Sequence, residues 1–178
     1  LEKFACASYM AELTDVMVAG REAGQEMYLL LLHSLSALED RSIMPALFLP
    51  AFELRLLIEV GYAPNMTDCQ VCGTALTHDD HALAFSPSLS GLVCPQCTAH
   101  AGATFRLSTE TLMLLQVWLA SEQPVFPFPD ISPRASQETR ALVSRLLAQH
   151  LPRPLKSAAF LDQMNVFSHA SIDDPQTG

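Results

Sequence analysis

The chain has 178 residues, of which 49% are apolar and only 16% are charged. This composition excludes a wholly disordered protein, and the length suits either one compact domain or one domain with a small satellite. The net charge of −9 should make the chain as a whole repel nucleic acid and anionic membranes. The sequence contains no run of about 18 consecutive apolar residues, so we expect no membrane-spanning helix.

The first part of the chain is expected to form two helices. Apolar residues recur at helical spacing over residues 4–19 and again over residues 25–38. Gly20 is a suitable stop for the first helix, and the short link to the second predicts an antiparallel pair. Cys6 stands alone in an apolar stretch, which favours a buried small side chain over a reactive thiol.

A third helical segment is expected over residues 43–60. Pro50 lies inside this segment and lacks the backbone N–H that a helix interior requires. We therefore expect a break there, followed by a regular helix over residues 51–60. Gly61 is a suitable residue to end that helix, since glycine readily adopts the left-handed conformation found after a helix.

The strongest signal is a set of four cysteines in two Cys-x-x-Cys pairs, with 21 residues between the pairs. Two residues between cysteines let both sulfurs of a tight turn reach one ion at about 2.3 Å. Catalytic zinc usually keeps three protein ligands and a water, so four cysteines predict structural Zn²⁺ instead. The predicted ligands are Cys69, Cys72, Cys94 and Cys97.

Three other uses of these cysteines remain open. They are a redox dithiol, an iron–sulfur cluster and a pair of disulfides. Disulfides are disfavoured, because no secretion signal is expected in the chain.

Between the two cysteine pairs, residues 82–85 and 91–93 are short apolar runs that predict the strands of a small ribbon. After the second pair, Ser108 is a suitable N-cap for a fourth helix, because apolar residues at helical spacing follow it.

The remaining chain is expected to hold a connector, one helix and a tail. The proline-rich stretch over residues 124–133 predicts a rigid connector rather than a ligand for a proline-binding domain. A fifth helix is expected from about Ser136 to His150. Residues 164–178 are expected to be a disordered tail.

Positive charge is concentrated near the end of the chain. Five of the ten basic residues lie between residues 134 and 156 with a single acid, which gives this stretch a charge of +4. It could receive an acidic partner or a phosphate backbone. The alternative is an ordinary solvated helix face, because Arg140 and Arg145 would lie about 140° apart around a helix and form no single stripe. The candidates are Arg140, Arg145, Arg153 and Lys156.

No catalytic constellation is apparent in the sequence. It contains no phosphate loop, no dinucleotide fingerprint and no nucleophile elbow, so we expect a protein that is not an enzyme. The predicted fold class is mainly α, a helical domain with an inserted four-cysteine zinc-ribbon-like element. We expect the helical domain over residues 1–66 and 101–163, the insertion over 67–100 and the tail over 164–178.

The order of several short motifs resembles one known family. These motifs are ASYMAEL at 7–13, FELRLL at 52–57, GYAP at 61–64, CxxCG at 69–73 and PLKSAAFL at 154–161. In this order they resemble the C-terminal part of the bacterial recombination mediator RecO, over nearly the whole chain. The FELRLL, GYAP and CxxCG run is the most specific part of the resemblance.

The resemblance implies a helical domain with a zinc-ribbon-like element, preceded in the whole protein by an OB-fold that we expect to lie outside this chain. RecO proteins bind and anneal DNA, and the OB-fold would be the main platform for DNA. They work with RecR and with the acidic tail of single-strand-binding protein, and they help to load RecA. No catalytic residues are attributed to the family.

We therefore expect a zinc-stabilised protein-interaction module of a DNA repair and recombination mediator, with no enzyme activity of its own. Direct nucleic-acid binding by this region alone is less favoured, because the chain is acidic. The alternative function, of a different class, is that of a thiol redox protein or another zinc-ribbon regulatory protein.

Overall fold

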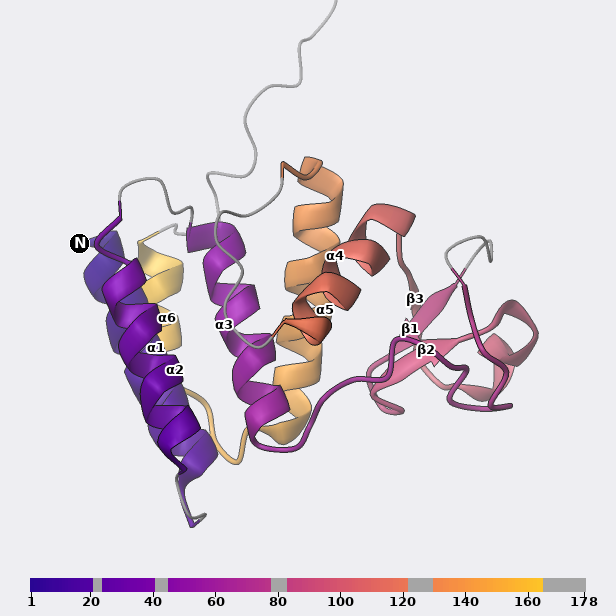
Figure 1. The fold of residues 1–178 in the computed structure, drawn as a ribbon, viewed down its shortest axis with the longest axis horizontal. Helices are drawn as coiled ribbons and strands as arrows, with labels where there is room; N and C mark the ends of the chain where they lie inside the picture. Colours follow the sequence, from indigo (N-terminus) through magenta and orange to yellow (C-terminus); the bar gives the residue numbers. More distant parts are fainter. Residues whose placement is uncertain (21–23, 41–44, 78–82, 122–129, 165–178) are drawn as a thin grey trace, which may run out of the picture.

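The computed structural model describes residues 1–20, 24–40, 45–77, 83–121 and 130–164. Across these residues the protein is mainly helical and carries a small sheet at one end, which confirms the predicted fold class (Figure 1). The elements are α1 (Glu2–Val18), α2 (Gln25–Ala37), α3 (Pro45–Glu59), β1 (Ala84–Ser86), β2 (Gly91–Val93), the 3₁₀ helix η1 (Pro95–His100), β3 (Phe105–Arg106), α4 (Thr109–Ala120), α5 (Pro133–His150) and α6 (Lys156–Gln163).

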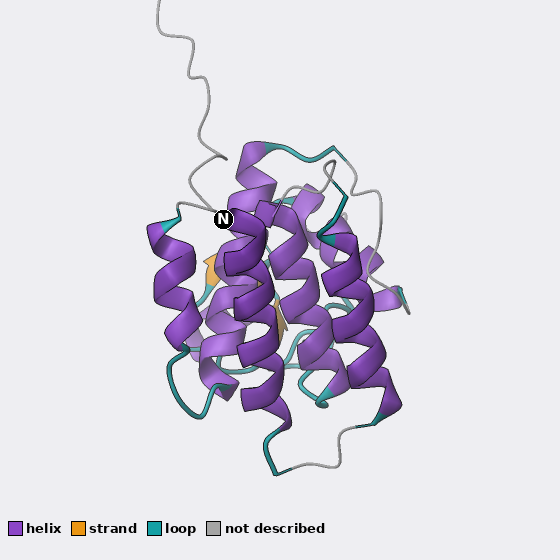
Figure 2. Ribbon diagram, turned by 90° about the vertical axis from the view of Figure 1, so that its left-hand side faces the viewer, coloured by secondary structure: helices purple, strands orange, loops and turns teal. Residues whose placement is uncertain are grey.

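Helix α1 packs against α2, α3 and α6 at the end of the molecule away from the sheet. Figure 2 looks at this end and shows the helices side by side in front of the strands. Buried residues recur every three or four positions along α1, as the apolar pattern predicts. Cys6 is wholly buried, as expected. Gly20 follows the helix with a φ of +78°, which confirms it as the stop.

Helix α3 is the centre of the helical part and contacts α1, α2, α4 and α5. A helix that is enclosed on most sides must be apolar around most of its circumference. This is the case here, because eight apolar residues of α3 are buried, namely Leu47, Phe48, Leu49, Ala51, Phe52, Leu54, Leu56 and Leu57. Gly61 ends the segment with a φ of +84°, as predicted.

The predicted break at Pro50 is wrong, because α3 runs without interruption from Pro45 to Glu59. Proline inside a helix costs about 3 kcal/mol through the lost hydrogen bond and the clash of its ring. Burying one large apolar side chain stabilises by about 1.5–3 kcal/mol. Phe48 and Phe52 flank Pro50 and are both buried, so their packing is enough to offset this cost.

Helices α4 and α5 pack against each other between α3 and the sheet. Ser108 is the N-cap of α4, and its side chain accepts a hydrogen bond from the N–H of Thr111, as predicted. The predicted start of α5 near Ser136 is wrong. The N-cap is Ser132, because Pro133 suits the first helical position and the Ser132 side chain accepts from the N–H of Ala135.

The sheet has the order β2-β1-β3, and both neighbouring pairs are antiparallel. Strand β2 lies where it was predicted, whereas β1 covers Ala84–Ser86 and ends one residue later than expected. Strand β3 has only two residues and was not predicted from the sequence. Two residues are too few to show the alternation of apolar and polar side chains that predicts a strand, so β3 is recognised only through its pairing with β1.

Helix α6, which packs against α1, was likewise not predicted from the sequence. Most of the predicted connector at 124–133 and of the tail at 164–178 lies outside the described residues. Among the helices that the structure describes, none is both long enough and apolar enough to cross a membrane.

Candidate metal centre

The loop after α3 is folded so that the first cysteine pair forms a tight turn. Asn65 begins the turn by accepting the N–H of Asp68 on its side-chain oxygen at 3.0 Å. Cys69 then donates its N–H to the carbonyl of Thr74, and Gly73 donates to the carbonyl of Cys69. Gly73 has a φ of +73°, a conformation that favours glycine. The glycine after the Cys-x-x-Cys pair is therefore needed for the turn itself.

This loop is held against strand β2, which leads to the second cysteine pair. The N–H of Gln70 donates to the carbonyl of Leu92 at 2.8 Å, and the N–H of Leu92 donates to the carbonyl of Asn65 at 3.0 Å. At Gly91 a Cβ atom would lie only 2.8 Å from the carbonyl oxygen of Asn65. The glycine at this position is therefore what lets the first loop and strand β2 approach closely.

The second pair begins directly after β2. Pro95 starts η1 immediately after Cys94, and the N–H of Cys97 donates to the carbonyl of Cys94 at 3.0 Å. The N–H of Cys94 points across to the first pair and donates to the sulfur of Cys69 at 3.3 Å. Strand β2 and η1 thus place the second pair opposite the first.

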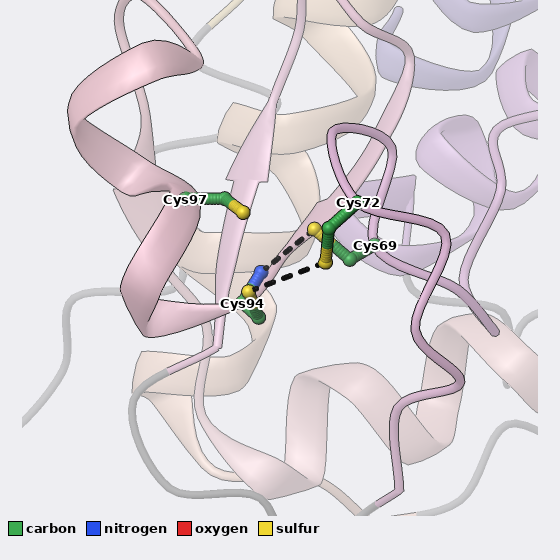
Figure 3. A group of neighbouring side chains, drawn as sticks. All are labelled: Cys69, Cys72, Cys94 and Cys97. Atoms are coloured by element: carbon green, nitrogen blue, oxygen red, sulfur yellow. Dashed lines mark hydrogen bonds between the residues drawn. The ribbon is translucent and has the colours of Figure 1, made fainter.

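The structure brings all four predicted ligands together (Figure 3). Their Sγ atoms all lie within 4.8 Å of one another, and those of Cys72 and Cys94 are 3.8 Å apart. A tetrahedron of sulfurs at about 2.3 Å from a zinc ion has edges of about 3.8 Å. The cluster therefore has the composition and nearly the dimensions of a four-thiolate metal site.

The surroundings of the four sulfurs leave their acidities unequal. Burial raises the pKa of Cys69, but the N–H groups of Cys94, Cys72 and Val71 outweigh it and bring the pKa to about 6. Hydrogen bonds with Thr74 lower the pKa of Cys72. The pKa of Cys97 is raised to about 12 by its hydrogen bond with Cys94 and by burial. A divalent cation would supply the positive charge that lets every thiol ionise together.

The chain matches a known protein family over nearly its whole length. The family model described as recombination protein O, C terminal, matches residues 1–159. This chain belongs to the RecO family. The match covers α1 to α5, the four-cysteine element and the first half of α6, so the elements described above correspond to the C-terminal region of RecO proteins.

Relatives named DNA repair protein RecO match 92% of this chain. The protein from Symbiobacterium thermophilum is 32% identical, and the chain covers 65% of its length. The protein from Thermoanaerobacter is 27% identical with 64% of its length covered, and that from Roseiflexus is 32% identical with 57% covered. The chain therefore spans about three fifths of the length of these RecO relatives.

The four predicted partner-binding residues of this RecO chain lie in two places. Arg140 and Arg145 are exposed on α5. The guanidinium of Arg145 lies 4.6 Å from the ring centroid of Phe105 on β3, a distance typical of a cation–π contact. Arg140 is close enough to the buried Glu53 for its charge to lower the pKa of that carboxyl group. The two arginines therefore face different neighbours.

Arg153 lies in the link before α6 and Lys156 is the first residue of that helix, and both contact the side chain of Glu12 from α1. Arg153 pairs with this carboxylate at 3.3 Å, and the backbone N–H of Lys156 donates to it at 3.1 Å. Ser157 adds its N–H and its hydroxyl. These hydrogen bonds, led by the Ser157 hydroxyl, lower the pKa of Glu12 to about 2. Glu12 thus caps α6 from a distant part of the chain.

One polar contact in the helical core escaped the sequence analysis. Tyr9 donates its hydroxyl to the carboxyl group of Glu53 at 2.5 Å, and both residues are buried. Burial raises the pKa of Glu53 to about 7, against the lowering effects of Tyr9 and Arg140. The only signal in the sequence is a single acid within an otherwise apolar stretch of α3.

Proposed function

We propose that this region is a non-enzymatic protein-interaction module of a RecO-type recombination mediator in the bacterial cytoplasm, stabilised by one structural Zn²⁺ ion. The observation that supports it most is the convergence of the four cysteine sulfurs within a chain of the RecO family. All four candidate ligands are cysteines, which leaves no position for substrate and suits a structural ion.

The whole protein is proposed to bind and anneal DNA and to help load RecA together with RecR and single-strand-binding protein. Its relatives carry the name DNA repair protein RecO, which supports this role. In this proposal DNA is bound mainly by an N-terminal OB-fold, and the helical region receives protein partners. The acidic balance of this chain fits such a division, since a net charge of −9 opposes nucleic acid.

We further propose that the positive residues of α5 and of the α6 start receive the acidic tail of single-strand-binding protein. Arginine recognises carboxylates through paired, charge-assisted hydrogen bonds, which suits an aspartate-rich peptide. The proposed residues are Arg140, Arg145, Arg153 and Lys156. Arg153 must share its guanidinium with Glu12, so we expect it to contribute least.

Fluorescence anisotropy with a labelled, aspartate-rich tail peptide tests this proposal. We expect the unaltered chain to bind, and Arg145→Gln and Lys156→Gln each to weaken binding by about threefold to tenfold. Arg134→Gln is the matched control, because Arg134 lies on α5, loses the same charge and pairs with Glu138 instead. The proposed site is wrong if the control weakens binding as much as the test variants do.

A further inference from the structure

The four cysteines of the metal centre differ strongly in their access to solvent. Cys69 and Cys94 are 1% and 6% exposed, whereas Cys72 is exposed. Its neighbours from position 71 to 75 are exposed as well, so the tip of the first loop stands in solvent. A reagent dissolved in water therefore reaches the sulfur of Cys72 more easily than either buried sulfur.

A cavity of about 530 Å³ opens beside this sulfur. Cys72 and Thr74 line it from the first loop, and Cys94 and Cys97 line it from the second. Three of the four candidate ligands line this cavity, so a bound ion would take part of its volume, and a small hydroperoxide would approach from the exposed side at Cys72. The cavity thus gives a small oxidant access to the side of the centre where the two cysteine pairs meet.

The sulfur of Cys94 is within contact distance of Cys72, at 3.8 Å (Figure 3). The two cysteines belong to different Cys-x-x-Cys pairs, and Cys94 is nearly buried. Within this pair, therefore, the exposed sulfur is suited to react first and the buried one to respond. This order follows from access and distance.

We propose that Cys72 is a site of reversible oxidation by hydroperoxides and that Cys94 resolves the oxidised form as a disulfide between the two cysteine pairs. This inference rests on the proposed Zn²⁺ site only in its prediction that oxidation releases the ion. The oxidation of the two sulfurs stands on their own geometry.

The chemistry balances in two steps. The Cys72 thiolate attacks one oxygen of the hydroperoxide, the O–O bond breaks, and sulfenic acid forms while hydroxide or alkoxide leaves. The Cys94 thiolate then attacks the Cys72 sulfur, a sulfur–sulfur bond forms, and hydroxide leaves. Two thiolates lose two electrons in total, and the peroxide bond gains them. A dithiol reductant reverses the change by thiol–disulfide exchange.

The disulfide would remove one ligand from each cysteine pair. Two cysteines then remain, which is half of the set that a structural four-thiolate zinc site uses. Oxidation should therefore release the ion and loosen the attachment of the first loop to β2. The same chain would lose its zinc element under peroxide stress and regain it on reduction.

Cys6 provides an internal control for access. It is fully buried in α1, and burial raises its pKa to about 11, so it should stay a neutral thiol under native conditions. Peroxide that modifies Cys72 at low excess should leave Cys6 untouched. Modification of both at equal rates would show unfolding rather than a specific site.

The test treats the full chain with hydrogen peroxide and follows zinc release with a chromogenic chelator. Mass spectrometry of the same samples maps the cysteines. We expect one ion released per chain, a disulfide that joins Cys72 to Cys94, and recovery of zinc binding after treatment with a dithiol. A disulfide within one pair, such as Cys69 with Cys72, would overturn the proposal.

A histidine variant tests the role of Cys72, since histidine binds zinc and does not form disulfides. Cys72→His should slow peroxide-driven zinc release by about tenfold or more. The matched control Cys6→Ala removes a cysteine outside the metal centre, keeps all four ligands and should release zinc as the unaltered chain does. Equal protection in both variants would contradict the assignment to Cys72.

Failure of the zinc proposal remains distinguishable from failure of this one. A chain that contains no zinc would refute the structural ion, but disulfide mapping would still report on the two thiols. A chain that contains zinc but keeps Cys72 and Cys94 reduced under peroxide would refute the oxidation site alone.

Discussion

Glu53 brings an ionisable group into the contact between α1 and α3. Its carboxyl group is buried, accepts the hydroxyl of Tyr9 and lies within the electrostatic reach of Arg140 on α5. The hydrogen bond and the nearby charge offset part of the cost of burying a carboxylate. The Glu53 side chain therefore interacts with groups on α1 and α5, and its charge state should affect the free energy of unfolding.

The pKa of Glu53 predicts how stability varies with pH. Burial raises this pKa from 4.5 to about 7, so the folded chain holds a proton that the unfolded chain releases in this window. Stability from this group is therefore greatest below about pH 4.5 and falls as the pH rises to about 7. At pH 8 the folded chain carries the full penalty of a buried carboxylate.

We expect Glu53→Gln to raise the free energy of unfolding at pH 8 by about 1–3 kcal/mol, because glutamine still accepts from Tyr9 and carries no charge. The gain should shrink as the pH falls below 7. Urea unfolding at several pH values measures it. Glu59→Gln on the same helix is the control, and parallel profiles for both variants would contradict this role of Glu53.

At the scale of elements, α4 and α5 cap each other. Glu110 in the first turn of α4 accepts the N–H of Ser132 at 2.8 Å, and Ser132 is the N-cap of α5. In return Glu138 of α5 accepts the N–H and the hydroxyl of Ser108, the N-cap of α4. Each carboxylate satisfies a helix start on the other helix, which fixes how the two helices meet.

The acidity of Glu138 follows from this arrangement. Burial raises its pKa, but the N–H of Ser108 together with Arg134 and nearby hydroxyls lowers it to about 2. A carboxyl group with a lowered pKa stabilises the folded chain above the pH at which the unfolded chain titrates. This stabilisation is lost as the pH falls from about 4.5 towards 2.

Glu138→Ala should lower the free energy of unfolding by about 1 kcal/mol at pH 7, which is the usual cost of a lost cap. The difference from the unaltered chain should vanish near pH 2. Gln137→Ala, an exposed neighbour on α5, is the control. Denaturant unfolding measures both, and an unchanged stability of the Glu138 variant would show that α4 needs no cap from α5.

At the scale of the whole molecule, the sheet and the helices share one core. Phe85 of β1 and Leu92 of β2 belong to the same buried cluster as residues of α1, α3, α4 and α5. Cys69 and Cys94 form a second, smaller cluster with Val93. The metal centre thus sits on an extension of the helical core, while the predicted boundary at residues 67–100 stays a prediction.

Removal of the metal should therefore lower the stability of more of the chain than the two cysteine pairs. We expect elemental analysis to find about one Zn²⁺ per chain and chelation to lower the midpoint of thermal unfolding, because metal binding is coupled to folding. Most far-ultraviolet helical signal should persist, since the helices have their own core. Cys6→Ala should keep its metal. A chain without zinc and with oxidised cysteine pairs would favour the redox alternative.

Sequence patterns were most informative where the chemistry is local. The spacing of the cysteines, the N-cap at Ser108 and the glycine stops at Gly20 and Gly61 each depend on a few adjacent residues. Such features are set by short-range geometry, so their positions in the structure agree with the prediction. The helical pattern of α1 belongs to the same class, because one buried face implies the period.

The remaining features depend on residues far apart in the chain. The unbroken α3 at Pro50, the two-residue β3, the cap of α6 by Glu12 and the buried Tyr9–Glu53 contact all require partners from other elements. The sequence by itself determined the mainly helical class and the four candidate ligands. Only the tertiary structure decided which carboxylates are buried, which cap a helix and which form ion pairs, because packing and long-range hydrogen bonds outweigh local preference at those positions.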